Sequence, residues 1–135
     1  MGTIFFELAL TLYFAGFLLS LAGVIRKKDD LDRAVFFLSL SGFALHTIYL
    51  VVRYIKSGQA PVFSMHEATS FFSWSILLIS LCINVHYKAR VMSFGIILTF
   101  AFMFIAAFFP RSVPSIKPEL KSLLIDIHAL MAVLG

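Results

Sequence analysis

Long apolar runs alternate with short polar breaks along this chain. The runs cover residues 3–25, 34–55, 67–85, 91–109 and, at the end of the chain, 122–135. A helix that crosses a bilayer needs about 20 mostly apolar residues, and in lipid its backbone amides must be satisfied within the segment. The pattern therefore predicts an all-α fold, a multi-pass transmembrane helical bundle with four full spans and the start of a fifth.

The last apolar run is too short to cross a membrane. It begins near Ser122 and reaches the final residue, Gly135, without a polar tail after it. We therefore expect residues 1–135 to be the N-terminal part of a longer transmembrane domain that is truncated at its C-terminus.

Composition supports a lipid environment. The chain is 61% hydrophobic and 13% charged, with a mean hydropathy of +0.99, whereas soluble domains are about 45–50% apolar and about 25% charged. These few charges cannot cover a water-facing surface, so membrane lipid is an expected partner. The single Cys82 excludes an intrachain disulfide.

The basic residues indicate topology. They give a net charge of +4 but lie in the breaks between apolar runs, so no nucleic-acid partner is expected. Lys and Arg are densest in residues 26–33 and 86–90, and short loops rich in Lys and Arg face the cytoplasm. This places the N-terminus, the loop around residues 56–66 and the loop of residues 110–121 outside.

Three polar residues of the second run share one helical face. Tyr49 and Arg53 follow His46 at i+3 and i+7. A neutral His46 could ligate a metal or haem iron, although a hydrogen bond between helices is the favoured alternative for a membrane histidine. Arg53 suits a carboxylate or a lipid phosphate, or it extends to the headgroups.

The third run starts with a second group of candidates. Glu67 can cap this helix, because a carboxylate is stabilised at the positive end of the helix dipole. Phe71 and Trp74 follow on one face, which is either a platform for a planar ligand or a packing surface. In the fifth run, His128 is either a metal ligand or a polar residue at a helix end. The sequence contains no hydrolase or phosphate-binding motif, so no catalytic residue is expected.

Three segments carry a resemblance to a known family. They are GFALHTIYLVVRYIKSGQAP (42–61), PVFSMHEATSFFSW (61–74) and PELKSLLIDIHALMAVLG (118–135). Together they resemble the N-terminal half of the cytochrome c assembly proteins, the haem-handling membrane family that includes CcsA, ResC and the HemX-like proteins. The chain departs from the family pattern at several positions, among them His66, where an aromatic residue is usual, and Leu124, where a tryptophan is usual.

The resemblance implies a protein that binds a b-type haem non-covalently. The haem would be delivered to apocytochrome c outside a bacterial cytoplasmic membrane, together with a partner membrane subunit. His128 matches the first of the family's paired outer histidines, and His46 is a second candidate for the iron. Glu67 and Arg53 would lie at the edge of the haem site, and Phe71 and Trp74 would line its apolar wall. The family's tryptophan-rich loop and second histidine are not in this sequence.

Two other functions remain open from the sequence. HemX-like members suggest a membrane regulator of haem synthesis that transfers no haem. A small ion-coupled transporter would use Glu7 as its membrane carboxylate. We do not expect this chain by itself to be an enzyme, although the family member to which it belongs would form part of a haem-attachment complex.

Overall fold

The computed structural model of the protein describes residues 2–26, 29–58, 60–87, 91–111 and 123–135. They form five α-helices, with no strand among the described residues, so the all-α prediction is confirmed. The helices are α1 (Gly2–Arg26), α2 (Asp29–Ser57), α3 (Met65–Tyr87), α4 (Met92–Ala107) and α5 (Leu123–Leu134).

Helix α2 begins earlier than the apolar pattern indicates. It starts at Asp29, whereas the second apolar run starts at residue 34, so most of the charged break is helical. A helix satisfies its own backbone hydrogen bonds, and charged residues at its end therefore do not interrupt it. The apolar run marks the part of the helix suited to lipid, and the helix itself is longer.

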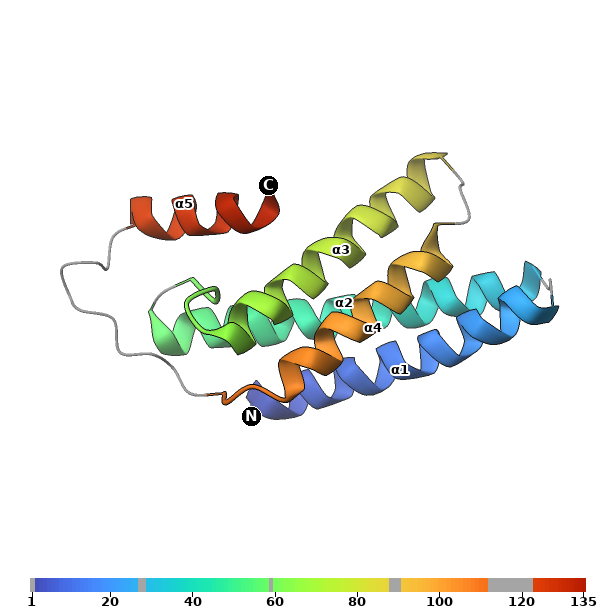
Figure 1. Ribbon diagram of the computed structural model, residues 1–135, viewed down its shortest axis with the longest axis horizontal. Helices are drawn as coiled ribbons and strands as arrows, with labels where there is room; N and C mark the ends of the chain where they lie inside the picture. The colour runs from blue at the N-terminus through green and yellow to red at the C-terminus, as the bar shows by residue number, and fades with distance from the viewer. Residues whose placement is uncertain (1, 27–28, 59, 88–90, 112–122) are drawn as a thin grey trace.

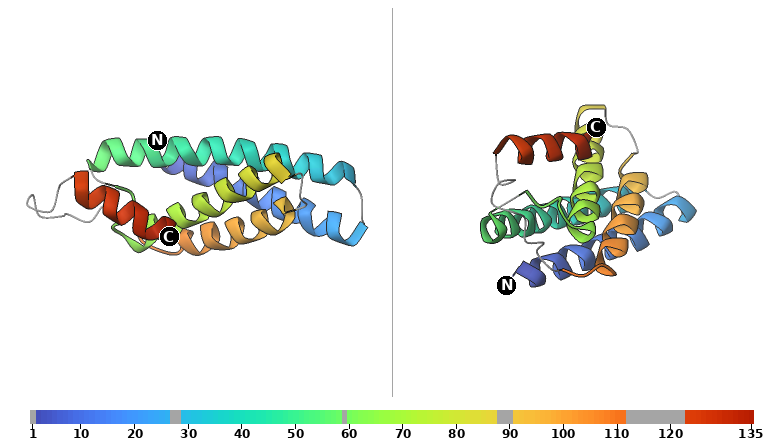
Figure 2. Two further views of the ribbon diagram at one scale, coloured as in Figure 1. Left: turned by 90° about the horizontal axis from the view of Figure 1, so that it is seen from above. Right: turned by 60° about the vertical axis from the view of Figure 1, so that its left-hand side comes forward.

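Successive helices from α1 to α4 run in opposite directions along the bundle (Figure 1). Helix α1 packs against α2 and α4, and α3 packs against α4. Helix α5 lies to one side of this bundle, next to α3 (Figure 2). The start of α1, the connection from α2 to α3 and the end of α4 therefore meet at one end of the bundle, which is the arrangement that the topology prediction requires.

Three of the described helices are long and apolar enough to cross a membrane. Their candidate spans are Gly2–Ile25, Leu31–Ser57 and Met65–Tyr87. Helix α4 is apolar but has 16 residues, or about 24 Å of helix, against a hydrocarbon core of about 30 Å. The structure thus supports three of the four predicted spans by length and composition.

Small residues let the helices approach closely. A Cβ atom at Gly42 of α2 would lie 2.5 Å from the ring of Tyr13 on α1, and a Cβ atom at Gly95 of α4 would clash with Ser80 of α3. Close approach at small residues is the usual way in which helices pack in a membrane. The absence of a side chain at Gly42 leaves room for the ring of Tyr13 between α1 and α2.

Candidate functional site: a buried polar network between the helices

His46 connects three helices. Its side chain is fully buried, with Nδ1 3.2 Å from the hydroxyl of Tyr13 on α1 and Nε2 2.9 Å from the hydroxyl of Ser70 on α3. Both ring nitrogens are therefore engaged, and both hydroxyl partners can donate or accept. The structure therefore contains the hydrogen bonds between helices that we favoured for this histidine from the sequence.

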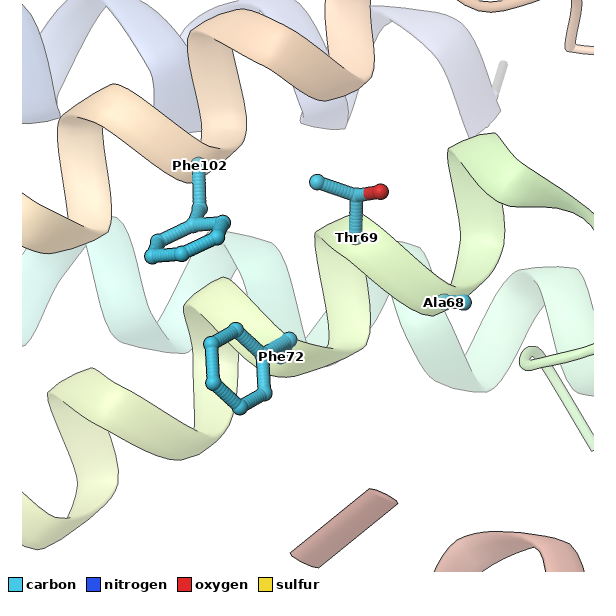
Figure 3. A pocket seen from close by; sticks show the side chains of 4 residues that line it. All are labelled: Ala68, Thr69, Phe72 and Phe102. Atoms are coloured by element: carbon cyan, nitrogen blue, oxygen red, sulfur yellow. The ribbon is translucent and has the colours of Figure 1, made fainter.

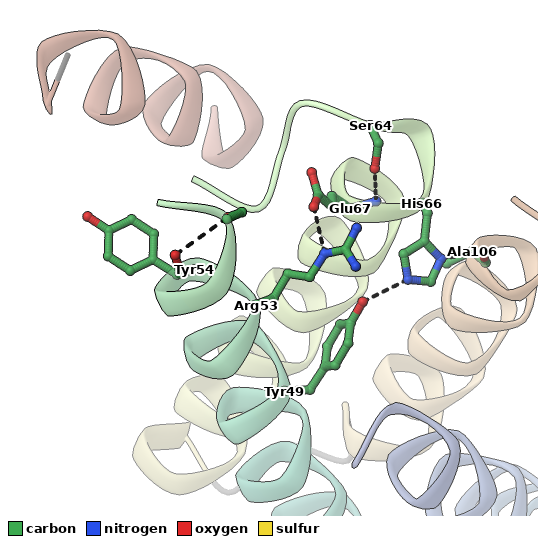
Figure 4. A network of polar contacts seen from close by, with 8 residues as sticks. Tyr49, Arg53, Tyr54, Ser64, His66, Glu67 and Ala106 are labelled. Atoms are coloured by element: carbon green, nitrogen blue, oxygen red, sulfur yellow. Dashed lines mark hydrogen bonds and ion pairs between the residues drawn. The ribbon is translucent and has the colours of Figure 1, made fainter. Parts of the chain in front are cut away.

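His66 makes a second connection of the same kind. Its Nδ1 lies 2.7 Å from the carbonyl oxygen of Ala106 on α4, and its Nε2 lies 2.8 Å from the hydroxyl of Tyr49 on α2 (Figure 4). A carbonyl oxygen only accepts, so Nδ1 carries the proton and donates it. In neutral His66, Nε2 then accepts from the hydroxyl of Tyr49. This fully buried residue was not predicted as a functional candidate.

The third member of the network is an ion pair. Arg53 Nε donates to Glu67 Oε1 at 2.7 Å, and the two side chains are 14% and 1% exposed (Figure 4). Glu67 Oε2 is buried and has no hydrogen-bond partner among the described residues. The pair joins the C-terminal part of α2 to the first turn of α3.

The structure corrects the role of Glu67 as the helix cap. The hydroxyl of Ser64 accepts the backbone N–H of Glu67 at 3.1 Å, so Ser64 supplies the side-chain cap. Glu67 lies in the first turn, near the positive end of the dipole, but its carboxylate is turned to Arg53. A serine followed three residues later by a glutamate is a known start signal for helices, and this signal in the sequence could have identified the cap.

The aromatic residues of α3 are packed against α2. Phe71 stacks on Trp74 with ring centroids 5.5 Å apart, and Phe43 of α2 stacks on Trp74 at 5.3 Å. The indole N–H of Trp74 donates to the hydroxyl of Thr47 at 2.9 Å. In this arrangement the rings pack against one another and against α2.

The structure brings five of the predicted site residues to the α2–α3 region and leaves one elsewhere. His46, Arg53 and Glu67 belong to the polar network, and Phe71 and Trp74 lie beside it. His128 is exposed on α5, and within the described residues no hydrogen bond or ring contact joins it to this group.

The histidines differ in whether a ring nitrogen is available to a haem iron. The iron needs an imidazole nitrogen with an available lone pair. His46 would have to give up its contact with Tyr13 or Ser70, so it does not fit this role as packed. The exposed imidazole of His128 does fit it. The described part of the chain contains no cluster of three or more His, Cys, Asp or Glu residues that could hold a metal ion.

An apolar depression lies apart from the network. It has a volume of about 350 Å³ and is lined by Ala68, Thr69, Phe72 and Phe102, from α3 and α4 (Figure 3). The hydroxyl of Thr69 donates to the carbonyl oxygen of Met65 at 2.6 Å, within α3. The walls therefore offer mainly apolar contacts, as a surface facing lipid chains does.

Glu7 does not have the surroundings of a coupling carboxylate. Its side chain is 62% exposed and pairs with Arg111 at 3.1 Å, at the end of the bundle. A carboxylate that couples transport would lie in the bundle interior or along a water-filled path. The position of Glu7 therefore gives no support to the transporter alternative.

In the part of the chain that the structure describes, the regular secondary structure is helical, and three of the helices are long and apolar enough to cross a membrane. The chain is similar to Protein HemX of Brevibacillus brevis, with 25% identity over 129 residues. The alignment covers 94% of this chain and 47% of HemX, so the chain spans about half the length of this curated relative. No protein-family model matches the chain, and no solved structure matches it.

Proposed function

We propose that this chain is part of a membrane protein that binds haem and delivers it for cytochrome c maturation. The observation that carries the proposal is the similarity to Protein HemX over 94% of the chain. HemX-like proteins are among the haem-handling proteins that the three sequence segments resemble, so this resemblance and the similarity to HemX both support a haem-related role.

The contrast among the histidines supports His128 as the residue that would hold a b-type haem. His128 is exposed, whereas His46 and His66 are buried with both ring nitrogens engaged. Bound haem would supply an iron centre whose reactivity depends on its axial ligand. The buried histidines and the Arg53–Glu67 pair would be positioning residues that fix the helices.

The proposal also includes a fourth membrane span and an orientation of the helices in the membrane. Phe108 and Phe109 extend the apolar length of α4 beyond its last helical residue, which favours a fourth span. With the dense basic breaks in the cytoplasm, the N-terminus and the polar network would lie at the outer face of a bacterial cytoplasmic membrane. Apocytochrome c and a second membrane subunit would be the partners there.

A second candidate is a membrane regulator of haem synthesis that transfers no haem. Two observations favour it: the relative is HemX itself, and the buried histidines serve helix packing. In this case the bundle would act as a binding surface for an enzyme of haem synthesis.

A haem titration of the detergent-purified chain tests the first candidate. We expect a Soret band in the wild-type protein that weakens or shifts in His128→Ala. His86→Ala is the matched control, because His86 is also exposed but lies near the opposite end of the bundle, at the end of α3. An unchanged spectrum in His128→Ala would remove His128 as the ligand.

The same titration separates the two candidates. If neither wild-type nor variant protein binds haem, the delivery role of this chain is rejected. Co-purification of a haem-synthesis enzyme with the haem-free protein would then support the regulator.

A further inference from the structure

A small basic pocket lies at the end of the bundle where α1 starts and α2 ends. Its volume is about 170 Å³. The lining combines the first residues of α1, one face of the last turns of α2, and an arginine that follows α4: Gly2, Thr3, Tyr49, Val52, Arg53, Lys56 and Arg111.

Positive charge predominates around this pocket. Arg53, Lys56 and Arg111 line it, and two carboxylates lie next to these cations: Glu67 on Arg53 and Glu7 on Arg111. Three cations thus stand against two carboxylates, and the side chain of Glu7 is 62% exposed to solvent. The carboxylates therefore leave an excess of positive charge at the site.

The backbone adds to this positive potential. Helix α1 begins at Gly2, so the pocket is lined by its first residues. The first N–H groups of a helix have no partner within it, and the helix dipole is positive at this end. Such a terminus binds phosphates and carboxylates readily, and here it is combined with three cationic side chains.

Two of the cations are held in place before any ligand binds. Arg53 is fixed by its 2.7 Å contact with Glu67, and the guanidinium of Arg111 lies over the ring of Phe6 at 4.9 Å. Side chains that are ordered in advance lose less entropy when they bind a ligand. The arrangement resembles a built anion site more closely than a set of solvated surface charges.

We propose that this pocket binds a phosphate group, either on the headgroup of a membrane lipid or as a free anion. Arginine presents several N–H donors in a planar geometry that matches phosphate oxygens. The proposal does not depend on whether the chain binds haem. Because the pocket lies where the apolar lengths of α1 and α2 end, a lipid headgroup could reach it directly from the bilayer.

The test uses two probes on the detergent-purified chain, inorganic phosphate and short-chain phosphatidylglycerol, with affinity measured by titration. We expect Lys56→Gln and Arg111→Gln each to weaken binding by about five- to tenfold. The matched control is Arg33→Gln, which removes the same charge near the opposite end of α2. Lys56→Arg keeps the charge and should retain most of the affinity.

Each outcome distinguishes a source or overturns the proposal. Binding of phosphatidylglycerol alone with this variant pattern identifies a lipid headgroup, and binding of both probes identifies a site that also accepts a free anion. The proposal fails if the wild-type protein binds neither probe. It also fails if Arg33→Gln loses as much affinity as the pocket variants, because binding would then depend on net charge alone.

Discussion

Each buried imidazole of this protein joins helices that are distant in the sequence. His46 links α2 to α1 and α3, and His66 links α3 to α2 and α4. A buried polar group without a partner is costly, so these hydrogen bonds select one arrangement of the helices. In membrane proteins such contacts contribute about 0.6–2 kcal/mol each.

Removal of the hydroxyl of Tyr49 should destabilise the fold. In Tyr49→Phe, Nε2 of His66 loses its donor, and we expect the free energy of unfolding to fall by about 1 kcal/mol. The measurement is denaturant unfolding in detergent. Tyr54→Phe is the control, because Tyr54 is five residues further along α2 and 45% exposed. Equal effects of the two variants would contradict the assigned role of the Tyr49 hydroxyl.

The two ion pairs should differ strongly in their contribution to stability. Glu67→Gln removes the negative charge beside a nearly buried guanidinium, and the loss of a buried counter-charge costs up to about 3–5 kcal/mol. Glu7→Gln makes the same chemical change in an exposed pair, and we expect a cost of about 0–1 kcal/mol. Unfolding free energies of the two variants decide the point, and a Glu67→Gln protein as stable as Glu7→Gln would contradict it.

Among the elements, α2 organises the bundle. One of its faces carries His46, Tyr49 and Arg53, and all three side chains contact other helices. One turn before His46, Gly42 leaves room for the ring of Tyr13. The close approach of α1 and the hydrogen bond to His46 therefore depend on the same short part of α2.

A methyl group at Gly42 should disturb this contact. In Gly42→Ala the new Cβ would meet the Tyr13 ring at 2.5 Å, so this ring, whose hydroxyl contacts His46, must shift. Overpacking of this kind costs about 1–3 kcal/mol. Unfolding experiments on this variant and on Gly23→Ala provide the comparison.

Gly23→Ala is a suitable control for that experiment. Gly23 also lies in the α1–α2 contact, but a Cβ there would meet Leu31 at an ordinary 3.6 Å. Because alanine favours a helix more than glycine does, we expect unchanged or slightly higher stability. A loss of stability at Gly23 equal to that at Gly42 would show that the tyrosine ring is not the cause.

At the scale of the whole molecule, the up-and-down order of the helices collects the polar groups at one end. The Arg53–Glu67 pair, His66, the basic pocket and the start of α1 are found there, whereas His46 and Tyr13 meet deeper in the bundle, near the middle of α1. Large apolar side chains such as Phe37, Val51 and Phe94 point outward along the bundle. This division fits a bundle with its sides in lipid, with the Arg53–Glu67 pair and His66 near one interface and the basic breaks of residues 26–33 and 86–90 near the other.

Cysteine labelling tests which ends of the helices lie on the same side of the membrane. In a Cys82→Ser background, single cysteines at Ser57 and Arg111 should react with an impermeant maleimide from the same side of the membrane, which we expect to be the outer side. A cysteine at Tyr87, which is 79% exposed at the end of α3, should react only from the opposite side. Labelling of Ser57 and Tyr87 from one side would contradict the proposed topology.

The sequence by itself determined the helical class of the structure. It also determined which polar residues share one face of α2. The apolar runs are long enough to require helices, because lipid offers no partner for backbone amides. The helical period placed His46, Tyr49 and Arg53 on one face, and their contacts confirm that they share it. These results follow from local geometry and from the solvent.

Only the tertiary structure decided which groups meet across helices. The partners of His46, Arg53 and His66 lie between 14 and 40 positions away in the chain, and no local pattern specifies such contacts. For this reason the sequence indicates His66 only as a departure from the family pattern, whereas the structure buries it between three helices. The burial of Trp74 against Phe43 and the pairing of Glu67 with Arg53 depend on how the helices pack, which a periodic pattern does not encode.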